Sequence, residues 1–476
     1  FFLMSEVAEV PREFDSAHTI CCIGAGYVGG CTFAVIASKC PMYQVIVCDI
    51  DERRIAQWNS DDLPLFEPNL QETIKEAQQK NNNLIFTTDV AGSIKRSDFI
   101  FVAVSTPTKT YGRGAGKAFD MTSWEAVSRC IAAESESDKI IIEKSTVPVR
   151  TAEKVSMILN SAKVHDINFE ILSNPEFLAE GSALRDLLFP DRVLVGGHNT
   201  ESGKVAIQRV CDIYRNWVPE EKIVTTNMWT SELAKLASNA MLAQRISSIN
   251  AISSLCEETG ADVEEVSSVL GMDDRIGRRY LKASVGFGGS CLKKDVLAMV
   301  YICETYELHE VAEFWKSIVT INEFQKQRFA TRILETMYGT VRGKKLCILG
   351  YAFKKDTGDV RESSAIEIVE YLQAENADLH IYDPRVTEND IHKRFPDVTV
   401  HKTVESAILG AHALVVITEW DEFKTYDYHS VFAKMQKPAF IFDGRNILDH
   451  DALEKIGFHV HAIGKRNKRE FKHFVL

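Results

Sequence analysis

The sequence has no C-x-x-C pair, although it contains eleven cysteines. That absence argues against a structural zinc site and against a thioredoxin-type redox motif. Several cysteines stand in apolar runs such as "ICCIG" and "VIVCD", where a cysteine is usually a small buried hydrophobic residue. We therefore expect reduced thiols, no bound metal and a cytoplasmic protein.

A long apolar run and an excess of positive charge are also missing. A membrane-spanning helix needs about 20 consecutive apolar residues, and neither such a run nor a signal-peptide pattern is found. The formal net charge is −12, whereas a nucleic-acid backbone requires a basic face. We expect no membrane and no nucleic acid among the partners. An anionic small molecule is compatible with this charge, because it needs only local N–H groups or a few cations.

The 476 residues are ordinary in composition for a globular protein, and their number predicts several domains. Over 17–225, apolar strand-like runs alternate with helical stretches, which predicts an α/β fold with a parallel sheet covered on both faces. A block with two long helices follows over 226–340. The strand–helix alternation returns over 341–465 and predicts a second doubly wound domain. The basic end, 466–476, is expected to be a flexible tail.

A glycine-rich turn follows the first predicted strand. Gly24, Gly26 and Gly29 stand in the spacing G-x-G-x-x-G, a helical stretch follows, and Asp49 ends the next strand. The first two glycines allow a tight turn and close approach of a pyrophosphate, and the third lets the helix pack on the strand. A carboxylate at Asp49 favours NAD, because it holds ribose hydroxyls and repels a 2′-phosphate. Arg53 and Arg54, just beyond, leave NADP open.

Other chemistry-bearing residues follow later strands. Hydroxyl side chains in "VSTPT" (104–108), and Ser145 and Thr146 in "EKSTVP", end two strands where ligands bind in such folds; ordinary loop chemistry is the alternative. Glu176 and Glu180 share a face if their segment is helical. One of them could then handle protons, and a solvated acidic face is the alternative.

The first long helix carries a lysine among apolar residues. Lys235 and Asn239 are four positions apart, and their neighbours are leucine and alanine. A lysine on the buried side of a helix needs a partner or a purpose. The alternative is a lysine that extends its ammonium group to solvent.

The stretch "GFGGSCLKKD" (286–295) combines glycines with a thiol. We expect Ser290 to cap a helix and to place Cys291 in its first turn. A helix N-terminus lowers the pKa of a thiol, and Lys293 and Lys294 add positive charge. Asp295 falls one turn further on the same face, where it suits a base that activates water. These residue types favour a nucleophilic cysteine over a buried one.

Five separated motifs occur in an order that resembles the UDP-glucose/GDP-mannose dehydrogenase family, and the UDP-glucose 6-dehydrogenases within it. They are "NPEFLAEG", "SELAKLASNAMLAQRISSIN", "FGGSCLKKD", "FKKDTGDVRESS" and "DGR". The resemblance runs from about residue 17 to about residue 463. It implies an NAD-binding Rossmann domain at 17–225 and a central helical domain at 226–340, with the dimer contact and the catalytic cysteine loop. It also implies a UDP-binding Rossmann-like domain at 341–465.

The resemblance implies a four-electron oxidation of UDP-glucose to UDP-glucuronate by NAD, which supplies polysaccharide or glycosaminoglycan synthesis. Cys291 would form first a thiohemiacetal and then a thioester, which water hydrolyses. The other catalytic residues would be Lys235 and Asn239 for the oxyanions, Asp295 for water, and Thr146 with Glu176 for a second water.

Binding residues carry over from the same motifs. The substrate would contact Glu176, Phe177, Leu178, Lys235, Asn239, Lys282, Phe287, Gly288, Gly289, Ser290, Cys291, Phe353, Lys354 and Arg445, and Arg275 would reach the site of a neighbouring subunit. NAD would contact Gly24, Ala25, Gly26, Tyr27, Val28, Gly29, Asp49, Arg54, Val104, Ser105, Thr106, Pro107, Thr108, Ser145, Thr146, Glu180 and Arg361.

The family also implies an allosteric hexamer built from dimers, with UDP-xylose as a feedback inhibitor. Ser105 and Leu292 depart from residues common in relatives, at positions without chemistry. Three other readings stay open. A GDP-mannose or UDP-N-acetylhexosamine dehydrogenase would share the cysteine, whereas a two-electron hydroxyacid dehydrogenase would have no use for it. A non-catalytic sensor would be expected to lose Cys291, Lys235 or Asp295.

Overall fold

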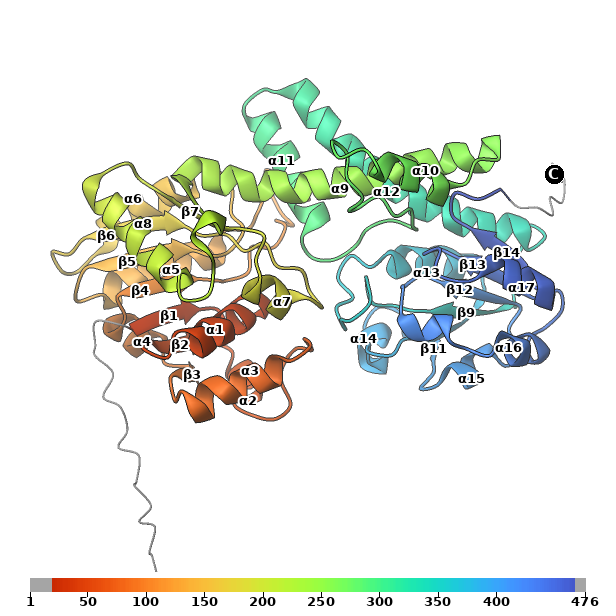
Figure 1. Cartoon of the computed structure of the whole chain (residues 1–476), viewed down its shortest axis with the longest axis horizontal. Coiled ribbons are helices and arrows are strands. Elements are labelled where there is room, and N and C mark those ends of the chain that lie inside the picture. Colours follow the sequence, from red (N-terminus) through yellow and green to blue (C-terminus); the bar gives the residue numbers. More distant parts are fainter. Residues whose placement is uncertain (1–18, 467–476) are drawn as a thin grey trace, which may run out of the picture. The chain divides into compact units, whose positions relative to one another are not determined.

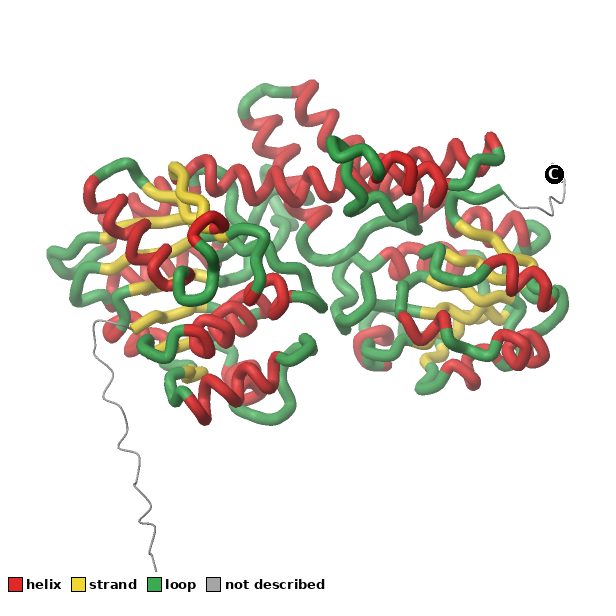
Figure 2. The backbone as a smooth tube through the Cα atoms, viewed as in Figure 1, coloured by secondary structure: helices red, strands yellow, loops and turns green. Residues whose placement is uncertain are grey.

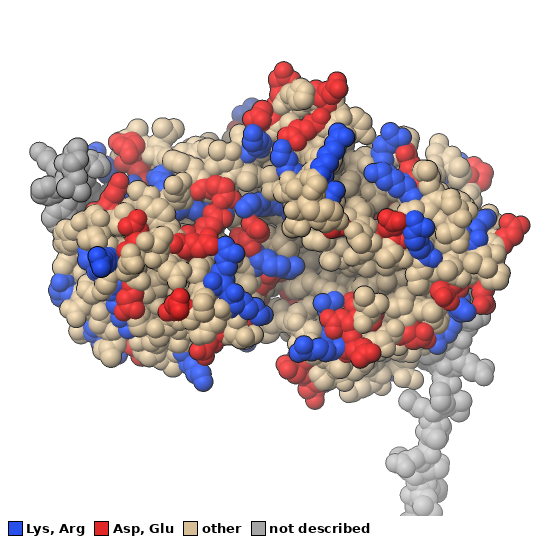
Figure 3. Space-filling model, turned by 180° about the vertical axis from the view of Figure 1, so that it is seen from behind, with Lys and Arg blue, Asp and Glu red and all other residues tan. Residues whose placement is uncertain are grey.

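The computed structural model describes residues 19–466. The expected basic tail lies outside the described residues except for its first residue. The chain divides into two compact units, visible in Figure 1. Within the described residues, the first unit holds 19–106 together with Asp120–Lys235, and the second holds Pro107–Phe119 and 236–466. On the face shown in Figure 3, acidic and basic side chains are interspersed over each unit.

The first unit is built on an eight-stranded sheet in the order β3-β2-β1-β4-β5-β6-β7-β8. Its first six strands follow the order of the doubly wound dinucleotide-binding folds, in which ligands bind where the order reverses, here between β1 and β4. All neighbours are parallel except β6 and β7, which pair antiparallel. The strands are β1 (Thr19–Ile23), β2 (Gln44–Cys48), β3 (Leu84–Thr87), β4 (Phe99–Val102), β5 (Lys139–Glu143), β6 (Phe169–Ser173), β7 (Val193–Gly197) and β8 (Ile223–Asn227).

Alternate residues of β1 point into two different cores, because successive strand side chains face opposite sides of a sheet. Ile20 and Cys22 pack with α1, α2, α3, α7 and α8, whereas Cys21 and Ile23 pack with α4, α5 and α6. The expected α/β sheet covered on both faces is confirmed, as the alternation of strands and helices in Figure 2 illustrates. The helical segments are α1 (Tyr27–Lys39), α2 (Glu52–Trp58), α3 (Leu70–Lys75), η2 (Glu76–Lys80), α4 (Val90–Arg96), α5 (Thr122–Glu134), α6 (Thr151–Ala162), α7 (Ala183–Leu188), α8 (Glu201–Tyr214) and η3 (Glu220–Lys222).

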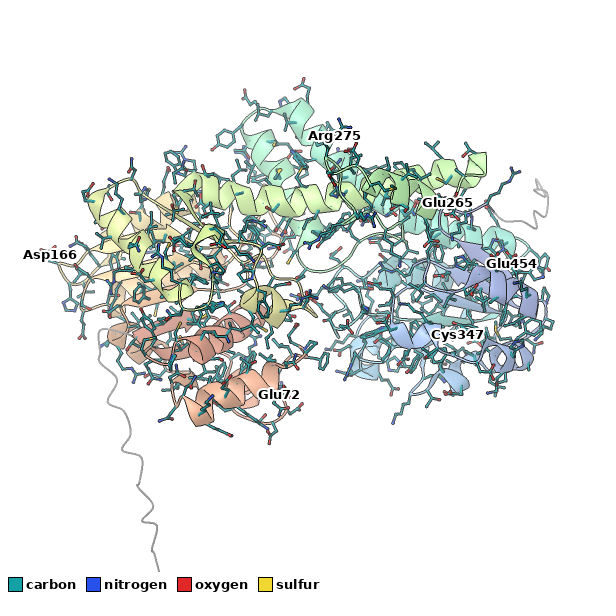
Figure 4. The ribbon with its side chains drawn as sticks, in the orientation of Figure 1. Glu72, Asp166, Glu265, Arg275, Cys347 and Glu454 are labelled. Atoms are coloured by element: carbon teal, nitrogen blue, oxygen red, sulfur yellow. The ribbon has the colours of Figure 1, made fainter. Side chains whose placement is uncertain are left out.

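The second unit contains a six-stranded parallel sheet in the order β11-β10-β9-β12-β13-β14. This order repeats the doubly wound pattern, so the second α/β fold predicted from the sequence is confirmed. Cys347, labelled in Figure 4, lies in its central strand and is fully buried. The strands are β9 (Lys345–Leu349), β10 (Asp378–Tyr382), β11 (Thr399–Val400), β12 (Ala413–Val416), β13 (Phe440–Asp443) and β14 (His459–Ala462).

Helices of the second unit pack on this sheet in one continuous apolar core, to which α9, α12 and α13 contribute. The two long helices predicted from the sequence are α9 (Met228–Thr259), which starts in the first unit, and α12 (His309–Thr336). Within 19–466, no helix combines the length and apolar character needed to cross a bilayer. The other helical segments are α10 (Val263–Gly271), α11 (Leu292–Thr305), α13 (Ser364–Ala374), α14 (Glu388–His392), α15 (Val404–Ile408), η4 (Asp421–Lys424), α16 (Tyr428–Lys434) and α17 (His450–Ile456).

Candidate functional site

The glycine turn between β1 and α1 has three glycines with three different surroundings. Gly24 has φ +110°, a conformation that residues with a side chain rarely adopt. A Cβ on Gly29 would lie 1.9 Å from the Gly24 carbonyl oxygen, so this helix packs against its own strand turn with no room for a side chain. A Cβ on Gly26 would meet nothing within 4 Å. This turn therefore fits a dinucleotide, because it is closed on the protein side and open at the helix N-terminus.

The second and third glycines support a paired prediction. Gly26→Ala should leave thermal stability unchanged without ligand and should raise the Kd for NAD by about 10-fold or more, because the added methyl group occupies the approach path of the pyrophosphate. Gly29→Ala should instead lower the melting temperature, because its methyl group collides with backbone. Calorimetric titration with NAD and thermal denaturation separate the two effects. Equal losses of stability in both variants would contradict this assignment.

Asp49 stands just beyond β2 and accepts hydrogen bonds from the turn. Ala25 N–H donates to Asp49 Oδ2 over 2.8 Å, and Arg54 Nη1 lies 3.1 Å from the same oxygen. Arg54 also pairs with Asp51 over 3.5 Å. Two carboxylates thus offset Arg54, one of the two arginines that left NADP open, which favours NAD.

The ends of β4 and β5 are joined through hydroxyl groups. Thr106 Oγ1 donates to the Thr146 carbonyl over 2.8 Å, and Ser145 Oγ donates to the Val104 carbonyl over 2.5 Å. These bonds fix the ends of β4 and β5, which the sequence analysis predicts to lie at the edge of the sheet where ligands bind. Pro107 and Thr108 belong to the second unit, where Thr108 bridges to Phe119.

Glu176 lies in a buried cluster with a lysine and a threonine. Lys235 Nζ is 3.4 Å from Glu176 Oε1, Thr146 Oγ1 is 3.5 Å from the same oxygen, and both charged side chains are more than nine-tenths buried. Lys235 also lies over the Phe177 ring, 5.4 Å from its centre. The lysine expected on the buried side of α9 is therefore buried and paired, so the solvent-extended alternative is wrong.

Glu176 and Glu180 would share a face only in a helical segment, and their segment is not helical. Residues 174–179 form no helix, and α7 begins only at Ala183. Glu176 contacts Lys235 from a segment with neither helix nor strand.

Sequence reasoning missed Glu67, which holds the loop that carries Glu180. Its buried carboxylate accepts hydrogen bonds from Gly181 N–H over 2.8 Å, from Ala183 N–H over 2.6 Å and from the Tyr27 hydroxyl. Tyr27 is the first residue of α1, so Glu67 ties the glycine turn to the start of α7. A weak signal in the sequence was an acidic residue set between a phenylalanine and a proline.

In the second unit, Cys291 is the exposed member of the eleven cysteines, of which nine are buried and Cys130 is half-buried. The expected helix cap is wrong. Cys291 itself, not Ser290, occupies the N-cap position of α11, and no side chain caps the helix. Gly289, with φ +87°, turns the chain immediately before and delays the helix by one residue. The Ser290 hydroxyl instead lies 3.4 Å from the Cys291 sulfur.

Asp295 lies in the first turn of α11 and is fully buried. Asn239 Nδ2 donates to Asp295 Oδ2 over 2.6 Å, and Lys294 Nζ lies 3.4 Å from Asp295 Oδ1. Lys293 pairs with Glu323 over 3.1 Å and with Glu362 over 2.9 Å. The two lysines expected to add positive charge beside the thiol are therefore largely offset by carboxylates.

The glycines before Cys291 are fitted against a segment that follows β9. A Cβ on Gly288 would lie 2.3 Å from the Glu362 carbonyl oxygen, and one on Gly289 would lie 2.8 Å from the Phe353 ring. Gly289 N–H donates to the Arg361 carbonyl over 3.0 Å. The second unit thus brings Cys291 close in the fold to two residues predicted from distant motifs.

Arg445 is joined to the same region, since its Nη2 donates to the Phe353 carbonyl over 3.0 Å. The Arg361 side chain pairs with Asp359, with Nε 2.9 Å from that carboxylate. Lys354 lies over the Phe353 ring, and Lys282 is exposed. Arg275, labelled in Figure 4 on the loop between α10 and α11, is exposed and pairs with Asp273 over 2.7 Å.

The sequence analysis also did not identify two amide side chains of α12. Asn322 is fully buried, accepts from Phe287 N–H over 2.8 Å and donates to the Phe287 carbonyl over 3.0 Å. Gln325 donates to the Ser284 carbonyl over 2.8 Å. Together they hold the backbone of the cysteine loop. Two amide residues on the buried face of a helix could have indicated from the sequence that they hold other parts of the chain.

Most of the chain matches a known family. Residues 18–218 match the NAD binding domain of the UDP-glucose/GDP-mannose dehydrogenase family, 229–324 match its central domain, and 347–450 match its UDP binding domain. A curated relative, UDP-glucose 6-dehydrogenase 5 of Oryza sativa subsp. japonica, is 54% identical over 467 residues, which cover 94% of this chain and 97% of the relative.

Solved structures show the same similarity. A UDP-glucose dehydrogenase from Pyrobaculum islandicum superposes with a TM-score of 0.82 at 28% identity, covering 95% of this chain and all of the other. The UDP-D-ManNAc dehydrogenase of Pyrococcus horikoshii superposes with a TM-score of 0.79 at 26% identity, covering 94% of this chain and all of the other.

Proposed function

The chain belongs to the UDP-glucose/GDP-mannose dehydrogenase family, and from that premise we propose that it oxidises UDP-glucose to UDP-glucuronate in one four-electron reaction. The protein is an NAD-dependent oxidoreductase with a nucleotide-sugar substrate. The high identity to UDP-glucose 6-dehydrogenases favours UDP-glucose over other nucleotide sugars. Its product would supply polysaccharide or glycosaminoglycan synthesis, and its location would be cytoplasmic.

One observation carries the cysteine chemistry: the thiol at the start of α11 is exposed, and the carboxylate one turn further is buried and held by an amide. A structural cysteine would be buried like most of the others in this chain. A nucleophile needs access to substrate, and a thioester needs a positioned base for the water that hydrolyses it. Cys291 and Asp295 meet these two requirements.

In the proposed first oxidation, the hydroxyl group at C6 loses its proton and C6 loses a hydride. NAD, when bound, would accept the hydride of each oxidation, so two NAD molecules would be used in turn, one for each step. Thr146 and Glu176 hold the water that accepts the hydroxyl proton, and Lys235 stabilises the developing alkoxide. The contacts of Glu176 with Lys235 and Thr146 support this grouping.

In the second oxidation, the Cys291 thiolate attacks the aldehyde carbon, so a C–S bond forms and the carbonyl oxygen becomes an oxyanion. Lys235 and Asn239 stabilise that oxyanion. Loss of a second hydride from the same carbon restores the carbonyl and leaves a thioester. Asp295 then takes a proton from water, which attacks the thioester; the C–S bond breaks, and the acid and the free cysteine result.

Substrate recognition is proposed for the remaining predicted residues. Phe353, Lys354 and Arg445 would contact the UDP moiety, which agrees with the UDP binding domain matched over 347–450. The cysteine loop, with Phe287 and Ser290, would contact the sugar side, together with Glu176, Phe177, Leu178 and Lys282 from the other predicted motifs.

The proposal includes an allosteric hexamer built from dimers, with Arg275 in a neighbour's site and UDP-xylose as inhibitor. Exposed large apolar side chains on α9, α10 and α12, including Met241, Val269 and Phe314, support contacts between copies. Light scattering should therefore give the mass of an oligomer.

The decisive experiment counts NADH formed per sugar consumed. UDP-glucose, GDP-mannose and UDP-N-acetylglucosamine are supplied separately, each at limiting concentration. Two NADH per UDP-glucose, with little turnover of the other two, supports the proposal. One NADH per sugar would instead indicate a two-electron dehydrogenase, and preference for an N-acetylhexosamine would favour the activity named for the P. horikoshii structure.

A further inference from the structure

A second buried lysine lies beside the Glu176 cluster and has no role in the reaction proposed above. Lys144 follows directly after β5, and its residue is 3% exposed. Its Nζ donates to Asn174 Oδ1 over 3.1 Å and to the Tyr214 hydroxyl over 3.4 Å. Among residues 19–466, no carboxylate lies within ion-pair distance of the Lys144 ammonium group, whose hydrogen bonds and ring contact are with Asn174 and Tyr214.

A buried ammonium group without a paired carboxylate is unusual, because the charged form loses its hydration and gains no full compensation. Purely structural packing would be served at lower cost by an apolar residue of similar volume. The neutral partners of Lys144 are themselves fixed: the Tyr214 hydroxyl donates to Asn174 Oδ1 over 2.5 Å, and Asn174 Nδ2 donates to the Leu194 carbonyl over 2.8 Å. The ammonium group is therefore held in a rigid setting.

Asn174, which accepts a hydrogen bond from Lys144, stands two residues before Glu176. The charged or titratable groups around Lys144 are Glu176 from the segment after β6, Lys235 from α9, Cys22 from β1 and Tyr214 from α8. Glu176 attracts the lysine charge and Lys235 repels it. Two lysines therefore surround one carboxylate, and a surplus of positive charge stabilises negative charge that develops nearby.

We propose that Lys144 is a positioning residue of the reaction: through Asn174 it holds the segment that carries Glu176, and it supplies a buried positive charge that attracts the Glu176 carboxylate. This inference rests on the proposed function, in which Glu176 and Thr146 hold the water that accepts the hydroxyl proton of the substrate. Burial and repulsion by Lys235 lower the pKa of Lys144 to about 8, although attraction by Glu176 opposes this shift. The charge is thus present at neutral pH and is lost in mildly alkaline solution.

The test compares Lys144→Gln, which is neutral but still donates to Asn174, with Lys144→Arg, which keeps the charge. The pH dependence of kcat/KM for UDP-glucose is measured for each. For Lys144→Gln, the midpoint of the acidic limb should rise by about one pH unit, because a nearby opposite charge shifts a carboxylate by roughly one to three units. Lys144→Arg should keep the midpoint of the wild type. Lys139→Gln, which neutralises a lysine at the other end of β5, is the matched control and should also leave it unchanged.

An unchanged midpoint in Lys144→Gln would overturn the proposal, as would equal rate losses in Lys144→Gln and Lys144→Arg without any change in midpoint. If Lys144→Gln does not fold, the comparison of Lys144→Arg with the wild type becomes the test. Its kcat/KM should persist above pH 8, where the wild type loses the lysine charge. Superimposable profiles of these two proteins from pH 7 to about 10 would then contradict the proposal.

A second measurement does not depend on activity. Because the pKa of Lys144 is about 8 in the folded state and about 10.4 in an unfolded chain, the unfolded state binds more protons between these values. The free energy of unfolding of the wild type should therefore rise over that interval relative to Lys144→Gln, and Lys144→Arg should show no such rise. If the wild type reduces no NAD with UDP-glucose, the proposed function fails, and this comparison still tells whether a charged lysine is buried there.

Discussion

Cys291→Ala should abolish sustained formation of UDP-glucuronate, with the steady-state rate falling by roughly 10³-fold or more, as is typical when a catalytic nucleophile is removed. The first oxidation needs Lys235, Glu176 and Thr146 but not the thiol, so it should be spared by comparison. NADH yield should fall from two per sugar to one or less, and the aldehyde should be detectable with a carbonyl-trapping reagent. Product analysis by mass spectrometry measures both quantities.

The matched control removes a different thiol from the helix that follows Cys291. Cys303 lies within α11 and is buried, so Cys303→Ala should retain two NADH per sugar. A Cys291→Ala protein that still yields two NADH per sugar at a wild-type rate would refute covalent catalysis by this residue. Equal loss of both oxidation steps would instead show that the thiol acts before the aldehyde forms.

The second large effect is expected for Asp295→Asn, which removes the base but keeps the size of the side chain. Hydrolysis of the thioester should slow by about 10²–10⁴-fold, the usual contribution of a positioned general base. Both oxidations precede that step, so a rapid burst of two NADH per site should be followed by slow turnover. The enzyme should accumulate with the oxidised nucleotide sugar attached to Cys291, which intact-protein mass spectrometry detects.

Glu313→Gln is a suitable control, because Glu313 is an exposed carboxylate on α12 that pairs with Lys316. It should leave burst and turnover unchanged. If Asp295→Asn slows the burst itself and no adduct appears, Asp295 would serve the fold or the first oxidation rather than the water step. The full burial of Asp295 makes a check of folding by circular dichroism necessary.

Local features of the chain were predictable because they depend on residues close together in sequence. The turn at Gly24–Gly29, the two long helices and both doubly wound patterns follow from glycine spacing and from the periodicity of apolar residues. The cysteine motif likewise predicted an accessible thiol, and Cys291 is exposed. The roles of these residues stay predictions until the variants above are measured.

The exact start of a helix and the direction of a strand were less predictable from the sequence. Ser290 is a good capping residue by type, yet α11 begins one residue later, because Gly289 is held by the Arg361 carbonyl from a distant segment. The antiparallel pairing of β6 and β7 has the same origin, since strand direction depends on how the chain returns to the sheet. Contacts between residues far apart along the chain determine these features, and such contacts leave no local sequence pattern.

The sequence by itself therefore determined which chemical groups the protein offers: a glycine turn for a dinucleotide, a thiol beside a carboxylate, and a lysine on a largely apolar helix face. Only the tertiary structure decided how those groups are charged and held. It paired Lys235 with Glu176, left Lys144 buried with neutral partners, and set Asn322 against the cysteine loop. The physical reason is that desolvation and ion pairing depend on neighbours brought together by packing, and those neighbours are far apart along the chain.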